Sequence, residues 1–247
     1  MKWLWRIFIL ILVCFIAPAL ASMAVYALGD HPNSWRNADW SSSGLLPAPR
    51  TSDEAAIYVM AARTGGLKGA LSVHSWIVFK EKSAAEYTRY DKVGWGLPVR
   101  KNSNPADGRW YSNEPTIIGA VHGEQAEKLI PELQKAIENY QFNYRGGYRI
   151  WPGPNSNTFV ATVLRSVPAL NIQLPPVAVG KDYLPLSSPL AISPDWRNAD
   201  FSVSGLAGLG LGLDTGIELR FAGLVFGADI LHPALKLPGF GRIGLVR

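Results

Sequence analysis

The sequence contains a single cysteine, Cys14, and it lies inside an apolar stretch near the N-terminus. The rest of the chain therefore has no thiol for a cysteine nucleophile and no pair of thiols for a disulfide. Val13 stands where a lipoprotein signal has a small residue, which argues against lipidation. The chain also lacks an HExxH pattern, a cysteine–histidine cluster and a phosphate-binding glycine loop, so it predicts neither a metal site nor a cofactor.

Charge is also scarce. Charged residues make up 17% of the chain, against about 25% in an average soluble protein. Such a composition is typical of a chain that lives at or near a lipid surface. The formal net charge is +5, but the basic residues are scattered and form no aromatic, basic platform, so nucleic acid is not expected as a partner.

The N-terminus carries the features of an export signal. Lys2 and Arg6 precede an uncharged run over residues 7–28, about the length needed to span a bilayer. Ala19-Leu20-Ala21 matches a signal-peptidase cleavage pattern. Residues 1–28 are thus predicted to be a cleaved signal peptide or an uncleaved anchor. The anchor is favoured because the apolar run continues beyond the cleavage pattern.

Both alternatives send the rest of the chain out of the cytoplasm, because the positive flank stays inside. The expected location is the inner membrane facing the periplasm, or the periplasm itself if the signal is cleaved. Residues 29–50 are rich in Pro, Ser, Asn and Trp and indicate a juxtamembrane linker. Residues 51–190 predict an α+β domain. Residues 191–247 predict a Gly- and Leu-rich β segment with a hairpin around Asp214.

Hydrophobic periodicity predicts the elements of the α+β domain. Residues 71–80 alternate as a strand, with one face formed by Val73, Ser75, Ile77 and Phe79 and the other by His74, Trp76 and Val78. Further strands are expected over 87–95, 116–121 and 148–151. Residues 124–140 predict a helix that Pro131 either kinks or divides, with an apolar stripe of Ala126, Leu129, Ile130, Leu133, Ile137 and Tyr140.

One segment occurs twice. WRNADWSSSGL over residues 35–45 returns as WRNADFSVSGL over residues 196–206. The spacing is too wide for a solenoid repeat. The segments predict either two similar structural units that pack against one another or two copies of a contact motif, and the structural interpretation is favoured.

Ser156 is the candidate nucleophile. It follows Asn155, a natural N-cap, at the predicted start of a helix, where free backbone N–H groups and the helix dipole stabilise an anion. His74, on the strand, is the candidate base. Capping and core packing explain the same residues without catalysis. Substrate contacts are expected from Trp76, Trp95, Tyr111, Arg149 and Asn157.

The stretches HSWIVFK, YTRYDKVGWG, GRWYSNEP, YRIWPGPNSNTF and GKDYL resemble the envelope family catalogued as domain of unknown function 3750. That family has no established activity. The resemblance therefore implies a location and an extent, without a chemistry.

A more distant similarity links His74 and the Asn155–Phe159 segment to the circularly permuted papain-like hydrolases and acyltransferases. It implies an antiparallel sheet packed on a helix with Ser156 at its N-terminus, His74 as base and Asn155 beside the nucleophile. That superfamily has cysteine where this chain has serine, and an alkoxide is much harder to form than a thiolate.

Two functions follow as hypotheses. The first is an envelope hydrolase or acyltransferase that acts on an amide or ester in peptidoglycan or lipid. The second is a non-catalytic, membrane-anchored module that binds an envelope polymer or a protein partner. Its aromatic groove would draw on Trp76, Trp95, Trp110, Tyr111 and Trp151.

Overall fold

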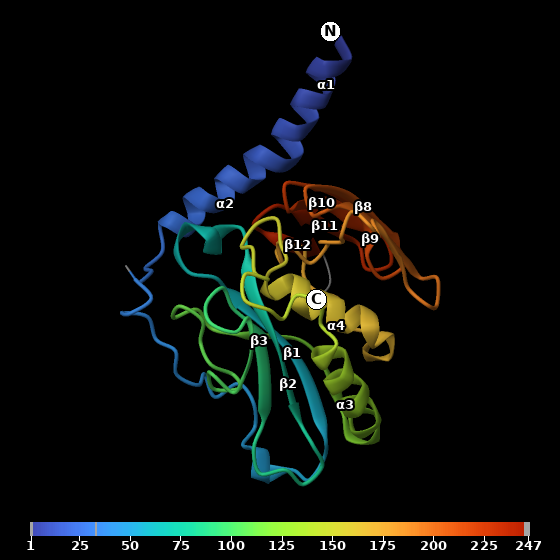
Figure 1. The fold of residues 1–247 in the computed structure, drawn as a ribbon. Helices are drawn as coiled ribbons and strands as arrows, with labels where there is room; N and C mark the ends of the chain where they lie inside the picture. Colours follow the sequence, from blue (N-terminus) through green and yellow to red (C-terminus); the bar gives the residue numbers. More distant parts are fainter. Residues whose placement is uncertain (1, 33, 245–247) are drawn as a thin grey trace.

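A long apolar helix forms the N-terminus of the computed structural model, which describes residues 2–32 and 34–244. The helix comprises α1 (Lys2–Ile11), a π-helical turn (Leu12–Ile16) and α2 (Ala17–Ala27), and it is long and apolar enough to cross a membrane. Its first part, α1, projects away from the rest of the chain (Figure 1). The Ser22 hydroxyl donates a 2.7 Å hydrogen bond to the Ala70 carbonyl, so the second half of the helix packs on the domain.

The centre of the domain is a five-stranded antiparallel sheet with the order β4-β3-β2-β1-β5. Sequential pairing of β1 to β4 makes a meander, and β5 adds to the free edge of β1. Its strands are β1 (Ala56–Arg63), β2 (Val73–Lys80), β3 (Thr88–Lys92), β4 (Val99–Lys101) and β5 (Thr116–His122).

Two helices cover one face of this first sheet. They are α3 (Gly123–Glu138) and α4 (Ser156–Ser166). The odd-numbered residues of β2, among them Ile77 and Phe79, join the main hydrophobic core with both helices. Every residue of the predicted α3 stripe is buried there. The expected α+β class with antiparallel sheets is therefore confirmed.

Loops cover the opposite face. The even-numbered residues of β2, including Trp76 and Val78, form a second core with Leu46 and Trp110. Trp40 packs edge-on against Trp110, with 5.0 Å between the ring centroids. Part of the predicted linker 29–50 is thus packed on the sheet, because its aromatic and aliphatic side chains bury apolar area there.

A second antiparallel sheet of seven strands follows, with the order β12-β11-β10-β9-β8-β7-β6. Its strands are β6 (Leu190–Ile192), β7 (Asn198–Val203), β8 (Ala207–Gly212), β9 (Gly216–Phe221), β10 (Leu224–Asp229), β11 (Ala234–Leu237) and β12 (Gly241–Gly244). The expected hairpin around Asp214 is its β8–β9 pair. Figure 1 shows this sheet in orange and red, beside α4 and below the N-terminal helix.

The helix α3 runs through Pro131, so Pro131 does not divide it, which was one of the two predicted alternatives. Two other sequence predictions need correction. Residues 148–151 form no strand, because this stretch bends into the Pro-rich turn before α4. The repeated segments do not form one kind of unit: residues 35–45 are mostly irregular and pair with the 107–113 region, whereas residues 198–203 are β7. Their different neighbours decide their structures.

Three short 3-10 helices among the described residues lie in connections. They are η2 (Pro49–Thr51), η3 (Gly66–Ala70) and η4 (Pro168–Leu170). The one that matters for the site is η4, because it follows α4 and starts the segment that leads to the second sheet.

Candidate functional site

The start of α4 is held by its own cap. Asn155 Oδ1 accepts hydrogen bonds from the backbone N–H groups of Asn157 and Thr158, at 2.9 and 3.1 Å. The Thr158 hydroxyl accepts from the Asn155 N–H at 3.1 Å, which completes a capping box. The Asn155 amide donates to the carbonyls of Ile150 and Val179. Asn155 is therefore a structural anchor whose polar atoms are occupied.

Asn157 fastens α4 to the first sheet. Its amide donates to the Val73 and Val179 carbonyls, each at 2.9 Å, and its Oδ1 accepts from the Ser75 hydroxyl at 2.8 Å. The side chain is buried. Asn157, predicted to contact substrate, instead joins two parts of the protein core.

Ser156 opens α4 as predicted, and it is buried. His74 lies on β2, one residue before Ser75. Because alternate side chains of a strand point to opposite faces, the contact of Ser75 with α4 places His74 on the far face. The structure does not bring His74 and Ser156 together.

His74 stacks on Trp110, with 3.6 Å between ring centroids and 7° between planes. Burial lowers the pKa of His74 well below its ordinary value, and the nearby Arg89 guanidinium lowers it further. His74 Nε2 has no hydrogen-bond partner within the described residues. This neutral, stacked ring fits a core residue.

A buried ion pair lies on the same face. Arg89 Nε donates to Asp91 Oδ2 at 2.7 Å, and both side chains are almost completely buried. Arg89 also stacks over the Trp76 ring, 4.2 Å from its centroid. The Trp76 indole N–H donates to the Ala106 carbonyl. Trp76 is therefore a core residue and not part of an open groove.

The remaining predicted contact residues are scattered. Trp95 and Arg149 are exposed, and Tyr111 is half-buried beside Trp40. Trp151 is half-exposed, and its indole N–H donates to the Ala222 carbonyl. With Trp76 and Trp110 buried, the five aromatic residues do not form one accessible groove.

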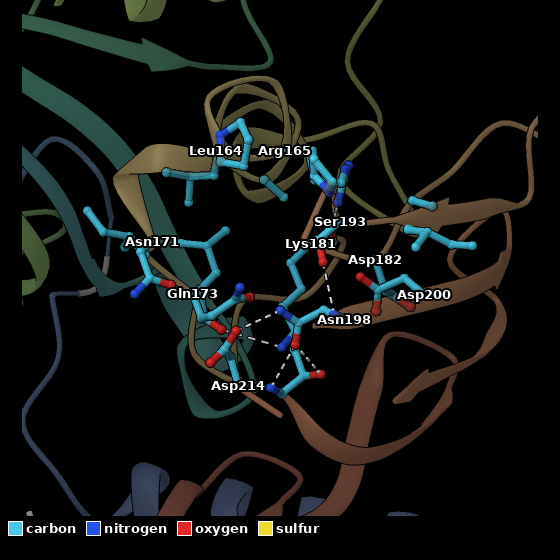
Figure 2. Close-up of a pocket in the computed structure, with 18 of the residues that line it drawn as sticks. Leu164, Arg165, Asn171, Gln173, Lys181, Asp182, Ser193, Asn198, Asp200 and Asp214 are labelled. Atoms are coloured by element: carbon cyan, nitrogen blue, oxygen red, sulfur yellow. Dashed lines mark hydrogen bonds between the residues drawn. The ribbon is translucent and has the colours of Figure 1, made fainter. Parts of the chain in front are cut away.

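A cavity of about 410 Å³ lies elsewhere, between α4, the segment that follows it and the second sheet. Figure 2 shows side chains from all three converging on it. Its apolar wall includes Leu164, Leu174 and Ile192. Its polar wall is formed by Arg165, Asn171, Gln173, Lys181, Asp182, Asn198, Asp200, Asp214 and Arg220.

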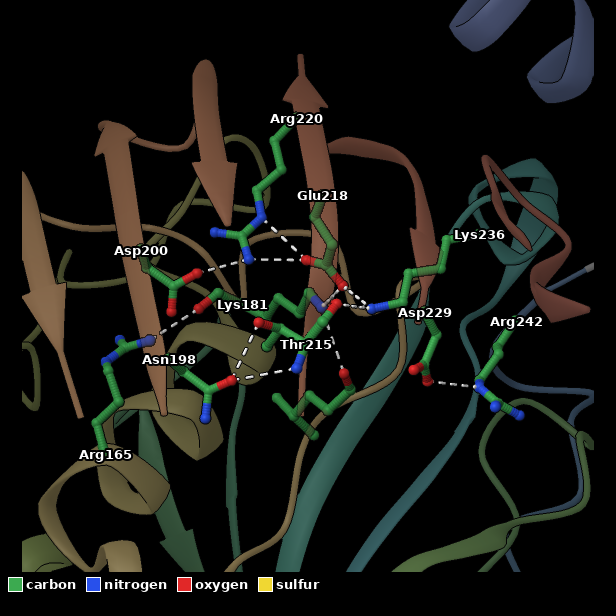
Figure 3. A network of polar contacts seen from close by, with 11 residues as sticks. Arg165, Lys181, Asn198, Asp200, Thr215, Glu218, Arg220, Asp229, Lys236 and Arg242 are labelled. Atoms are coloured by element: carbon green, nitrogen blue, oxygen red, sulfur yellow. Dashed lines mark hydrogen bonds and ion pairs between the residues drawn. The ribbon is translucent and has the colours of Figure 1, made fainter. Parts of the chain in front are cut away.

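A network of ion pairs borders this cavity (Figure 3). Glu218 is its centre: it accepts from Arg220 Nη2 at 2.7 Å, from Lys236 Nζ at 2.7 Å and from Lys181 Nζ at 3.1 Å. Arg220 Nη2 also lies 2.6 Å from Asp200 Oδ1. The long Arg220 side chain packs against Gly210, where a Cβ would clash with its guanidinium.

Three polar atoms of residues at the cavity have no hydrogen-bond partner among the described residues: Asp182 Oδ2, Asp200 Oδ1 and Arg220 Nη1. Asp200 Oδ1 lies in an ion pair with Arg220 Nη2, which leaves Asp182 Oδ2 and Arg220 Nη1 as the two atoms without a partner of either kind. Burial raises the pKa of Asp182, and Arg220 opposes this effect. The acidic partners of Arg220 raise the pKa of its guanidinium although burial opposes them. Unpaired buried donors and acceptors are costly, so a polar group that paired with these two atoms would be stabilised there.

In the part of the chain that the structure describes, no group of three or more His, Cys, Asp or Glu side chains is arranged to hold a metal ion. The cavity's acidic side chains are distributed among basic partners instead.

A family model described as protein of unknown function (DUF3750) matches residues 54–183, just over half of the chain. The chain belongs to this family. No curated protein and no solved structure matches it. The DUF3750 region contains the first sheet, α3, α4 and one wall of the cavity, including Lys181 and Asp182. The second sheet, which supplies the opposite wall, lies outside it.

Sequence reasoning missed the cavity because its walls are far apart in the chain. Arg165 and Asp182 belong to the DUF3750 region, whereas Asp200 and Arg220 lie on β7 and β9. A signal was present in GIELRF over residues 216–221, where two charged residues alternate with apolar ones. This pattern predicts a strand, but it does not say which of its two faces is buried.

Proposed function

We propose that this protein is a non-catalytic binding module, tethered to the envelope membrane by its N-terminal helix, whose ligand occupies the cavity between α4 and the second sheet. One observation carries the proposal: Asp182 Oδ2 and Arg220 Nη1 border one cavity and lack partners among the described residues. Buried polar atoms are nearly always paired.

The two atoms define the chemistry of the ligand. An ionised Asp182 accepts hydrogen bonds and attracts an ammonium group, whereas Arg220 donates to a carboxylate. The apolar wall from Leu164 and Ile192 favours a short aliphatic portion between the charged ends. The ligand class is therefore a small zwitterion, such as a short peptide with free ends, of the kind released when peptidoglycan stems are cut from their sugars.

The hydrolase alternative rests on the placement of Ser156 at the first turn of a buried helix. A serine needs a base, and His74 faces the other side of the sheet. Lys92 lies on the α4 side of β3, but its ammonium group donates to the Tyr140 hydroxyl and to the Phe142 and Gly147 carbonyls. The resemblance to the permuted papain-like proteins therefore gives the hydrolase hypothesis less support than the cavity gives the binding hypothesis.

Isothermal titration calorimetry of the detergent-solubilised full chain tests the proposal. The probe is the dipeptide L-Ala-D-Glu, compared with its N-acetylated form and with the form in which both carboxyl groups are amidated. Binding of the free dipeptide is expected, with each blocked form weaker by roughly tenfold or more, because each loses a charge-assisted hydrogen bond.

Asp182→Asn is expected to weaken binding of the free dipeptide while leaving the N-acetylated form unaffected. Glu132→Gln, on the exposed side of α3, is the matched control and should bind as the parent does. Equal binding of all three probes, or no difference between Asp182→Asn and Glu132→Gln, contradicts the proposed site.

A further inference from the structure

The second sheet is inverted with respect to an ordinary surface sheet. In β9, Glu218 and Arg220 are buried, whereas Ile217, Leu219 and Phe221 are exposed. An antiparallel sheet with one solvated face normally turns its apolar residues inward. Here the charged residues face the rest of the protein, and the apolar residues face out.

The inversion extends across the whole sheet. The strand register aligns Leu190, Phe201, Leu209, Leu219 and Phe226 in one row across five strands. The next outward row is Ile192, Ala199, Leu211, Ile217, Ala228, Leu235 and Ile243, which crosses all seven. Both rows are entirely apolar. We call these two rows, with Val203 and Phe221, the outer face.

The outer face is open over most of its area. Leu190, Leu235 and Ile243 are each more than half exposed, and Phe201, Leu211 and Ile217 nearly so. Soluble monomers rarely expose a contiguous apolar patch of this extent. The row between the two apolar rows points to the other side of the sheet, towards the rest of the protein. It includes the charged residues Asp200, Glu218 and Lys236, which are buried or half-buried.

The N-terminal helix meets this same face. Phe15 is buried against Phe221 and Phe226, with ring centroids 5.8 and 6.2 Å apart. The neighbouring helical residues Leu12 and Val13 are exposed. The outer face and the exposed side of the helix thus belong to one apolar surface.

The position of this contact along the helix indicates what covers the surface. Phe15 follows Arg6 by nine residues, about 14 Å along the helix axis, and the intervening run is uncharged. The contact therefore lies within the apolar stretch and not beyond its end. Trp3 and Trp5, both largely exposed beside Lys2 and Arg6, suit the opposite membrane interface.

We infer that the outer face of the second sheet lies in the bilayer. It contacts the acyl chains of the leaflet on the side of the membrane where the domain lies. The inference rests on the membrane tether of the proposed function and adds a second, larger lipid contact. The buried network around Glu218 then has a structural purpose, because it joins an otherwise apolar sheet to the domain below. The lipid contact also holds the ligand cavity close to the membrane surface.

Site-specific fluorescence in vesicles tests the inference. The full chain with Cys14→Ala receives single cysteines by Leu211→Cys or Ile217→Cys, each labelled with the polarity-sensitive dye NBD. Val13→Cys reports on the helix, and Glu132→Cys, on exposed α3, is the aqueous control. Phosphatidylcholine–phosphatidylglycerol vesicles carry doxyl spin labels on the acyl chains, and iodide probes the water phase.

The expected result is blue-shifted emission at positions 211 and 217, with strong doxyl quenching and at least several-fold weaker iodide quenching than at position 132. Iodide quenching equal to that at position 132 overturns the inference. Blue-shifted emission without doxyl quenching also overturns it, because protein and not lipid would then cover the face. Doxyl quenching at position 13 distinguishes the membrane tether from the lipid contact of the sheet. Quenching at position 13 without quenching at positions 211 and 217 would support the helix as a tether and would exclude lipid contact by the second sheet.

Discussion

The hydroxyl of Ser75 donates a 2.8 Å hydrogen bond to Asn157 Oδ1, which joins the central strand of the first sheet to the start of α4. This contact decides the orientation of β2. It directs the odd-numbered side chains to the helices and leaves His74 on the opposite face, against Trp110. His74 is separated from Ser156 because neighbouring side chains of β2 point to opposite faces of the sheet.

Asn157→Ala should destabilise the folded chain by roughly 2–3 kcal/mol, because it removes the buried acceptor of the Ser75 hydroxyl and the amide donor to the Val73 and Val179 carbonyls. Denaturant unfolding in detergent measures the change. Ser166→Ala, an exposed position on the same helix, should alter stability by less than about 0.5 kcal/mol. Equal effects of the two substitutions would show that Asn157 does not fasten α4.

The surroundings of His74 and of Glu218 could not be predicted from the sequence, for one physical reason. The alternation in residues 73–79 correctly divides His74 from Ser75, and the alternation in residues 216–221 correctly divides Glu218 from Leu219. Alternation defines two faces of a strand but does not say what covers each face. In β2 the face that carries Ser75 packs against α4. In β9 the face that carries the charged residues points to the protein interior.

Local signals were sufficient elsewhere. The α3 stripe from Ala126 to Ile137 is buried as predicted, because helical periodicity and one apolar core suffice to orient it. The Asn155 cap also forms as predicted. The cavity was beyond reach, since Arg165 and Arg220 meet only through the packing of α4 on the second sheet.

The burial of His74 predicts an acid-sensitive fold. Its pKa is well below the ordinary value in the folded chain, whereas the unfolded chain binds a proton at about pH 6.5. The unfolded state therefore binds more protons below this pH, and the stability falls by up to about 1.4 kcal/mol per pH unit. Thermodynamic stability measured between pH 7 and 5 should show this slope.

His74→Phe keeps a ring on Trp110 and should remove that part of the slope. His232→Phe, at an exposed position, serves as the matched control and should keep it. A slope that survives in His74→Phe would assign the acid sensitivity to another group.

Ser156 is expected to be unreactive. A fluorophosphonate probe labels serines that a base activates, and the base predicted for Ser156 faces away from it. The detergent-solubilised chain should therefore remain unlabelled under conditions that label a serine hydrolase added to the same sample. Labelling that disappears in Ser156→Ala would instead establish the hydrolase alternative.

Glu218 should be the most sensitive position in the second sheet. Burial alone would raise its pKa, but Lys181, Arg220 and Lys236 together hold the pKa well below the usual range. Glu218→Gln leaves three buried or nearly buried cations without their shared carboxylate. The expected loss is about 3–5 kcal/mol, measured by denaturant unfolding of the full chain in detergent.

The same substitution should change the response to acid. A carboxylate with a depressed pKa stabilises the fold above its ordinary pKa, and this stabilisation is lost as the pH falls towards the lower folded value. The parent should thus lose stability below about pH 4.5, and Glu218→Gln should lose less over that range. Asp214→Asn, which breaks the exposed pair with Arg197, should cost less than about 1 kcal/mol. Equal costs for Glu218→Gln and Asp214→Asn would mean that the network does not hold the inverted sheet on the domain.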